Sequence, residues 1–185
     1  MNITVYLGAN FGNKPIFKDK VIELGKYIGS NGYTLIYGGS KAGLMGALAI
    51  SCMESGGKVI GIEPRSFVEK ELQLDGLNEL IVTENMRERK TKLIEYGDAF
   101  IAFPGGTGTL EEVSEVMSMA SLNKLNRPCI IYNIDGYYDS FKLLLDRMVE
   151  DGLSTKERLC GISFCSSLSE IDTIIKSFVK EKENR

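Results

Sequence analysis

The sequence predicts one three-layer α/β domain, in which helices cover both faces of a central parallel sheet. Short, uniformly apolar runs recur along the chain, and segments with apolar residues at helical spacing lie between them. Apolar runs without polar alternation are typical of strands buried on both faces. The 185 residues, 43% hydrophobic and 25% charged, suffice for one core that buries about 70% of the unfolded surface. We therefore expect a single domain over residues 1–180 and a charged, frayed tail over residues 181–185.

The first half of the chain contains four of the expected strands. They are Ile3–Leu7, Tyr33–Tyr37, Val59–Ile62 and the short Leu80–Val82. The first helix begins near Pro15, because proline is tolerated at the first helical position, and ends at Asn31-Gly32. A second helix follows Gly38-Gly39-Ser40. The segment 63–78 interrupts the alternation, and the sequence leaves open whether it is a lid, a specificity loop or a solvated connection.

The second half repeats the alternation. A helix that begins with Asn85-Met86 leads to the apolar run Ala99–Phe103, where Pro104 ends the strand. The remaining strands are Pro128–Tyr132 and Ile162–Cys165, and the remaining helices are Tyr138–Val149 and Leu168–Val179. Strands that alternate with helices at this pitch indicate right-handed crossovers and parallel pairing.

A glycine-rich turn follows the strand Ala99–Phe103. Gly105, Gly106 and Gly108 allow the backbone to approach a ligand closely, and helical spacing resumes from Leu110. The free N–H groups and the positive dipole end of a helix N-terminus bind anions, and phosphate is the anion that we expect. Glycine turns also follow two other strands, at Gly8 and at Gly38-Gly39. Because carboxyl ends of parallel strands share one edge, the three turns are expected to converge on one pocket.

Two common nucleotide motifs are absent. A dinucleotide fingerprint beginning at Gly106 would place Glu111 where the third glycine belongs. The stretch Gly38–Gly43 has the spacing of a P-loop, but Leu44 and Met45 stand where Lys and Ser or Thr are required. The sequence therefore argues against a nucleotide triphosphatase and against a dinucleotide-dependent oxidoreductase.

The composition limits the chemistry further. The chain has no histidine, which excludes Ser-His-Asp and Cys-His catalysis and histidine-ligated metal. A net charge of −3 with mixed signs gives no basic footprint for nucleic acid or an anionic membrane. No apolar run approaches a membrane span, and the N-terminus lacks a signal peptide, so we expect a cytoplasmic protein. Carboxylate, Arg, Lys, Tyr and backbone dipoles remain as catalytic groups.

The charged residues near the turn have two interpretations. Thr109-Leu110-Glu111-Glu112 fits a capping box, in which Glu112 would be purely structural. Arg89 and Lys90 fit either a solvated basic helix face or cationic help for a phosphate site. Local sequence does not decide between these roles.

Three motifs together resemble the LOG family, the cytokinin riboside 5′-monophosphate phosphoribohydrolases often labelled lysine decarboxylases. Residues 104–112 reproduce the family's P-G-G-x-G-T-x-x-E motif, and residues 86–90 are similar to its M-H-x-R-K motif. Residues 37–39 and 43–46 resemble its Y-G-G-G-x-x-G-L-M-G stretch. The family's histidine is here Arg87, and Ala9-Asn10 replace its small polar residues after the first strand.

The resemblance implies a Rossmann-like homodimer that hydrolyses the N-glycosidic bond of a nucleoside 5′-monophosphate, without metal or cofactor. It assigns Glu112 and Arg89 as the catalytic pair. The substrate-binding residues that it implies are Glu71, Lys90, Gly105, Gly106, Thr107, Gly108, Thr109, Gly38, Gly39, Gly43 and Met86. The preferred base, adenine or an N6-substituted adenine, stays open. A non-catalytic carrier of a nucleotide or of the molybdenum cofactor is the alternative, although a carrier has no evident need for the carboxylate of Glu112.

Overall fold

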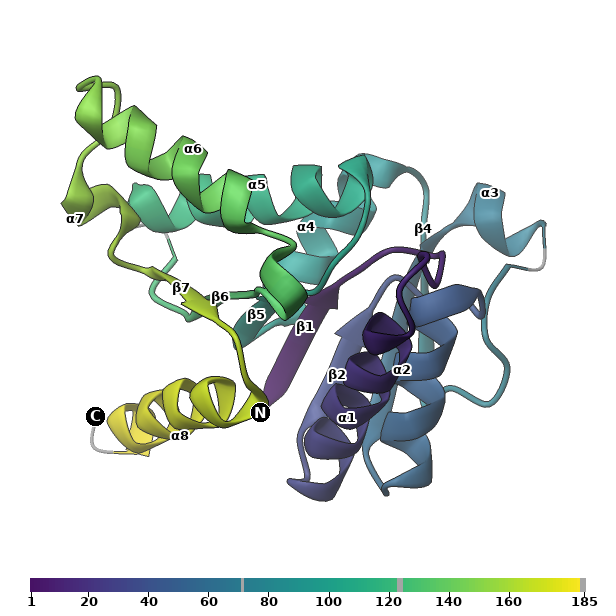
Figure 1. Cartoon of the computed structure of the whole chain (residues 1–185). Coiled ribbons are helices and arrows are strands. Elements are labelled where there is room, and N and C mark those ends of the chain that lie inside the picture. Colours follow the sequence, from purple (N-terminus) through teal and green to yellow (C-terminus); the bar gives the residue numbers. More distant parts are fainter. Residues whose placement is uncertain (71, 123–124, 184–185) are drawn as a thin grey trace.

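The computed structural model describes residues 1–70, 72–122 and 125–183, and Figure 1 shows how the elements are arranged. In this part of the chain seven parallel strands form one sheet, in the order β4-β3-β2-β1-β5-β6-β7. The strands are β1 (Asn2–Tyr6), β2 (Thr34–Tyr37), β3 (Lys58–Pro64), β4 (Glu79–Thr83), β5 (Ala99–Ala102), β6 (Cys129–Tyr132) and β7 (Ile162–Cys165). The helices are α1 (Pro15–Ser30), α2 (Gly43–Glu54), α3 (Arg65–Val68), α4 (Met86–Tyr96), α5 (Thr107–Ser121), the 3-10 turn η1 (Ile134–Gly136), α6 (Asp139–Glu150), α7 (Lys156–Leu159) and α8 (Leu168–Glu183).

The strand order reverses at β1, which pairs with two strands of the sheet. Ile3 lies opposite Leu35 of β2 on one side and opposite Ala99 of β5 on the other. In open parallel sheets the crevice beyond this switch point is the usual ligand site. The all-parallel sheet confirms the predicted fold class and puts the turns after β1 and β5 next to each other.

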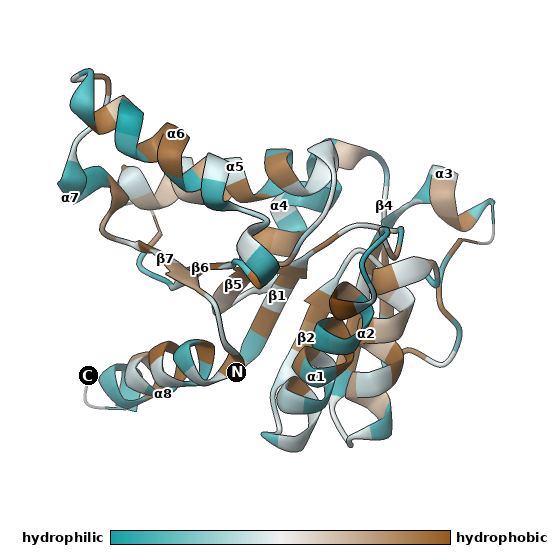
Figure 2. Ribbon diagram, viewed as in Figure 1, coloured by the Kyte–Doolittle hydropathy of each residue, from teal (hydrophilic) through white to brown (hydrophobic). Residues whose placement is uncertain are grey.

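Two apolar clusters hold the three layers together, one on each face of the sheet. The first joins buried residues of α1, α2 and α8 to β1 and β2, including Val21, Leu48 and Ile171. The second joins α4, α5 and α6 to the opposite face, including Leu93 and Val116. Figure 2 shows the corresponding pattern, with apolar residues concentrated on the strands and polar residues on the outer parts of the helices. Burial on both faces explains why the strands read as unbroken apolar runs.

The structure corrects several predicted boundaries. β3 continues through Pro64, because its last residues pair with Val82 and Thr83 of β4, and the segment expected to be irregular then contains α3. α8 extends to Glu183, so residues 181–183 are helical, whereas the sequence predicted a frayed tail from residue 181. Within the described residues, no helix combines the length and the apolar character needed to cross a bilayer.

Candidate active site

A cavity of about 490 Å³ opens at the carboxyl edge of the sheet, beyond the switch point between β1 and β5. Its lining includes several of the residues singled out in the sequence: Gly8, Met86, Arg89, Lys90, Gly105, Gly106, Thr107, Gly108, Thr109 and Glu112. The turns after β1 and β5 therefore converge on one pocket, as expected. The turn after β2 does not contribute Gly38 or Gly39 to the lining.

The N-terminus of α5 forms one wall of this cavity. The helix begins at Thr107 with Gly106 as its N-cap, and no side chain caps it. The first amides of a helix have no acceptor within the helix, so those of Thr107, Gly108 and Thr109 are available to an anion. A Cβ at Gly106 or Gly108 would meet no atom within 4 Å, which means that these two positions face open space. This wall has the features of a phosphate cradle.

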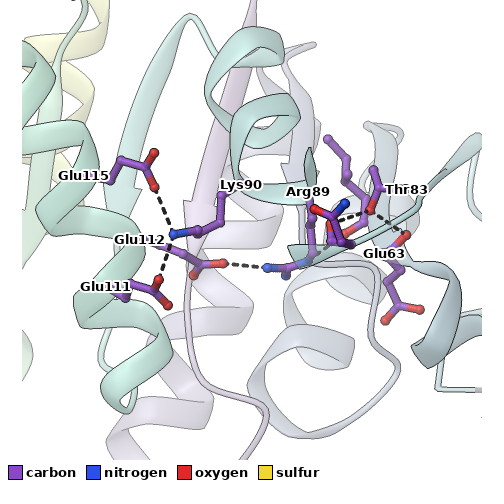
Figure 3. Close-up of polar contacts among 9 residues, drawn as sticks. Glu63, Thr83, Arg89, Lys90, Glu111, Glu112 and Glu115 are labelled. Carbon is purple, nitrogen blue, oxygen red and sulfur yellow. Dashed lines mark hydrogen bonds and ion pairs between the residues drawn. The ribbon is translucent and has the colours of Figure 1, made fainter. Parts of the chain in front are cut away.

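Arg89 and Glu112 form a buried ion pair beside the cradle. Arg89 Nη1 lies 2.7 Å from Glu112 Oε1, and the two side chains are 7% and 11% exposed. Arg89 Nε also donates to the carbonyl of Ile62 at 2.9 Å. Figure 3 shows the pair bridging α4 and α5. Arg89 Nη2 makes no hydrogen bond among the described residues, and it lies against Gly38, where an added Cβ would collide with it.

The position of Glu112 removes the capping interpretation. α5 begins at Thr107, so Glu112 stands at the sixth helical position, beyond the third position that a capping box requires. A reciprocal cap occurs instead at α4, where Asn85 accepts from the Glu88 amide and Glu88 accepts from the Glu84 amide. Burial raises the pKa of Glu112, and the Arg89 charge opposes that increase. Glu112 is therefore a carboxylate kept in a desolvated site by one cation.

Lys90 is held by carboxylates at the opening of the cavity. Its Nζ lies 2.7 Å from Glu111 and 3.3 Å from Glu115, as Figure 3 shows. The hydrogen bond to Glu111 raises the pKa of Lys90 above its usual range. Lys90 is thus a fixed positive charge, and its predicted role in substrate binding stays a prediction.

The glycines near β2 make room for neighbouring groups, and their predicted role in substrate binding stays a prediction. A Cβ at Gly38 would collide with Arg89 Nη2, and one at Gly39 would lie 3.0 Å from the Glu63 Cδ atom. Gly43 has φ +51°, and a Cβ there would collide with the carbonyl of Ala9. These three residues were expected to contact substrate, but none lines the cavity. Glycine is required at these three positions because a larger residue would collide. The space is already occupied by the side chains of Arg89 and Glu63 and by the turn after β1.

Other site residues were missed or lie outside the described chain. Glu71, which the family resemblance assigned to substrate binding, is outside the described residues.

Phe67 of α3 and Tyr137 both line the cavity, and the Tyr137 hydroxyl donates to the Gly105 carbonyl. No sequence pattern singled them out, although an aromatic residue in the irregular segment was a usable signal for a base-binding surface. No group of three or more potential metal ligands occurs among the described residues.

Glu63 is a buried carboxyl that the sequence did not predict. It is fully buried, and neither oxygen has a hydrogen-bond partner among the described residues. Figure 3 shows Glu112 and Glu63 on opposite sides of Arg89. Burial raises the pKa of Glu63 to about 7, although the charge of Arg89 opposes this increase. Glu63 therefore changes its charge near neutral pH.

We expect Glu63→Gln to stabilise the protein progressively as the pH rises from 5 to 8. The carboxyl pKa of about 7 in the folded state exceeds its ordinary value of 4.5, so the folded state keeps the proton longer. Below pH 4.5 both states are protonated and the burial costs little, whereas above pH 7 a charge is buried. At 1.36 kcal/mol per pKa unit the variant should gain about 3 kcal/mol over the wild type. Urea unfolding at pH 5 and pH 8 measures the gain.

The exposed Glu79 provides a matched control for this comparison. Glu79→Gln removes the same charge from the neighbouring strand, and its effect on the free energy of unfolding should stay nearly constant between the two pH values. An equal effect of both substitutions at pH 8 would contradict a buried ionisation of Glu63.

The fold and the cavity define a Rossmann-like α/β protein with its candidate site at the topological switch point. The family described as "Possible lysine decarboxylase" matches residues 45–175. The chain is 35% identical over 181 residues to cytokinin riboside 5′-monophosphate phosphoribohydrolase LOG of Oryza sativa, covering 98% of this chain and 75% of that protein. Arabidopsis thaliana LOG1 gives the same identity and covers 98% and 85%. The chain belongs to the LOG family, as its motifs indicated.

Solved structures share the same architecture. The molybdenum cofactor binding protein of Rippkaea orientalis is 25% identical, with a TM-score of 0.71 and 96% of each chain covered. The molybdenum cofactor carrier protein of Chlamydomonas reinhardtii is 21% identical, with a TM-score of 0.72 over 97% of this chain and 98% of that one. At that identity the second likeness concerns the fold alone.

Proposed function

We propose that this protein is an enzyme that hydrolyses the N-glycosidic bond of a nucleoside 5′-monophosphate, such as a cytokinin riboside 5′-monophosphate or AMP. The observation that carries the proposal is the buried Arg89–Glu112 pair, which lies in one cavity with the uncapped N-terminus of α5. The relatives of this chain are named for that reaction. The products are the free base and ribose 5-phosphate.

The geometry accounts for the order of events. The 5′-phosphate binds the amides at the start of α5, and Glu112 stands five residues further along the helix, a rise of about 7.5 Å. In this proposal a ribose 5-phosphate anchored at those amides extends towards Glu112, which brings its anomeric carbon to the carboxylate. The C1′–N bond breaks with its electron pair remaining on the base, which takes a proton from solvent, and the water that adds to C1′ returns one proton to solvent. Glu112 stabilises the oxocarbenium-like sugar and orients the water that adds to C1′. Arg89 Nη2 holds the anionic substrate.

The lysine decarboxylase description does not suit this cavity. A lysine that forms a Schiff base must be neutral, and such lysines have lowered pKa values. Lys90 is the lysine that lines the cavity in the described part of the chain, and Glu111 raises its pKa instead. Its ion pairs at 2.7 Å and 3.3 Å also occupy the nitrogen. Lys90 therefore acts as a charge and not as a nucleophile.

A carrier of a nucleotide or molybdenum cofactor is the weaker candidate. Binding requires an anion cradle, but a carrier gains nothing from burying a carboxylate beside an anionic ligand. The deciding experiment incubates the pure protein with a panel of nucleoside 5′-monophosphates and measures release of ribose 5-phosphate. Release from at least one nucleotide is the expected result. Tight binding of nucleotides without release from any of them would favour the carrier.

We also propose that the protein is a homodimer. Met117 of α5 is buried in the chain's own core and Met119 packs partly against that core, whereas Leu122, directly after the helix, is exposed. Leu143 and Leu144 of the neighbouring α6 are 67% and 51% exposed. Large apolar side chains exposed on neighbouring elements are typical of an interface. Light scattering at micromolar concentration should give twice the chain mass of 20.5 kDa, and a monomeric mass would refute the proposal.

A further inference from the structure

Tyr6 carries a buried hydroxyl that the fold does not use. The residue ends β1 at the switch point and is 2% exposed. Its ring stacks on Phe100 with a centroid separation of 6.3 Å and an interplanar angle of 6°. The hydroxyl is fully buried and has no hydrogen-bond partner among the described residues. A phenylalanine would make the same packing contacts without leaving a buried donor unsatisfied.

The Tyr6 ring packs with residues that neighbour the Arg89–Glu112 pair in the sequence of α4 and α5. Tyr6 belongs to the apolar cluster that contains Leu93, one turn after Arg89, and Val113 and Val116, which follow Glu112 directly and by one turn. Burial raises the pKa of Tyr6 well above its ordinary value, and the charge of Glu112 is the next largest cause. The hydroxyl therefore stays protonated, and it is a donor in the electrostatic field of the Glu112 carboxylate.

Glu112 has a second carboxylate oxygen that can accept a hydrogen bond from this hydroxyl. Its Oε1 accepts from Arg89, and Oε2 has no partner among the described residues. When Arg89 contacts a bound nucleotide, its hold on the carboxylate weakens, and Glu112 needs a second donor to remain ionised and oriented. We propose that Tyr6 is a positioning residue whose hydroxyl donates to Glu112 in the occupied site. This inference rests on the proposed hydrolytic function.

The other charged groups around Glu112 do not replace this donor. Those that influence the carboxylate are Arg89 and Lys90 on α4, and Glu111 on its own helix. Glu111 and Glu115 already hold Lys90. The Tyr6 hydroxyl, by contrast, is a buried donor without a partner among the described residues.

The test is Tyr6→Phe, with Tyr27→Phe as the matched control. Tyr27 donates to Asp172 at 3.0 Å, outside the cavity, so its variant should keep wild-type turnover. Tyr6→Phe should lower kcat roughly 10-fold with little change in KM, because a hydrogen bond to the reacting carboxylate is lost. Loss of a donor to the charged form also raises the pKa of Glu112. The acid limb of the kcat/KM profile should therefore move to higher pH.

A second readout does not depend on activity. Carboxyl ¹³C NMR follows the titration of Glu112 in protein saturated with inorganic phosphate, and Glu112→Gln identifies the signal. The apparent pKa of Glu112 should be higher in Tyr6→Phe than in the wild type. A wild type without hydrolase activity would contradict the proposed function, while this titration would still test Tyr6. The inference would be overturned if Tyr6→Phe left kcat, the acid limb of the kcat/KM profile and the titration of Glu112 unchanged. The Tyr6 hydroxyl would then be only a buried polar group that destabilises the fold.

Discussion

Glu112→Gln is expected to lower kcat by roughly 10² to 10⁴ while leaving the fold intact. Glutamine keeps the shape of the side chain and an oxygen that accepts from Arg89, but it supplies no charge to stabilise an oxocarbenium-like sugar. Arg89 then lacks its counter-charge in a site where it is 7% exposed, so a stability loss of about 1–3 kcal/mol is also expected. Single-turnover kinetics and urea unfolding measure the two effects separately.

Phosphate binding provides the internal control for this variant. The cradle consists of the first amides of α5, so inorganic phosphate should bind Glu112→Gln as well as it binds the wild type in calorimetry. Glu95→Gln removes the same charge from the exposed part of α4 and should retain turnover. If Glu112→Gln hydrolysed the substrate at the wild-type rate, the carboxylate would be purely structural and the hydrolytic mechanism would have to be abandoned.

Removal of the 5′-phosphate from the substrate should lower kcat/KM by roughly 10³-fold or more. The phosphate lies far from the bond that breaks, and its binding energy positions the sugar in the transition state, so its loss reduces kcat as well as affinity. Adenosine and AMP, or the riboside and its monophosphate, are the pairs to compare by chromatography of the released base.

Adding the missing group separately sharpens this experiment. Inorganic phosphite occupies a phosphate cradle and should partly restore hydrolysis of the nucleoside, provided that the α5 N-terminus is the site of recognition. Comparable kcat/KM values for nucleoside and nucleotide would show that the anion site does not serve catalysis. No rescue by phosphite, together with a strict requirement for the nucleotide, would place phosphate recognition elsewhere.

The sequence predicted those features that depend on local pattern. The strand and helix order follows from apolar runs and helical spacing, and the turn at residues 105–108 carries its own signal in three glycines. Glu112 was ambiguous because its decisive contact is with Arg89, 23 positions earlier in the chain. A local match to a capping box cannot register such a partner, and only the helix start at Thr107 rules the cap out.

The glycines after β2 show a different limit. Glycine indicates that some atom comes close to the backbone, but it does not indicate which atom. At Gly38 and Gly39 the nearest atoms belong to the side chains of Arg89 and Glu63. Glu63 itself was assigned to an irregular segment, because Pro64 marked the expected end of the strand. Pairing with β4 extends β3 and buries the carboxyl, and that pairing is a tertiary effect.

The Arg89–Glu112 pair also has a mechanical consequence. α4 packs over β1, β2 and β3, while α5 packs over β1, β5 and β6, so this contact braces the two halves of the sheet against each other. A nucleotide whose phosphate binds α5 and which also contacts Arg89 connects the same two halves of the sheet through its sugar. After the base has left, ribose 5-phosphate is the part of the substrate that still lies between α4 and α5. The connection between the two halves of the sheet is therefore expected to depend on which part of the substrate is still bound.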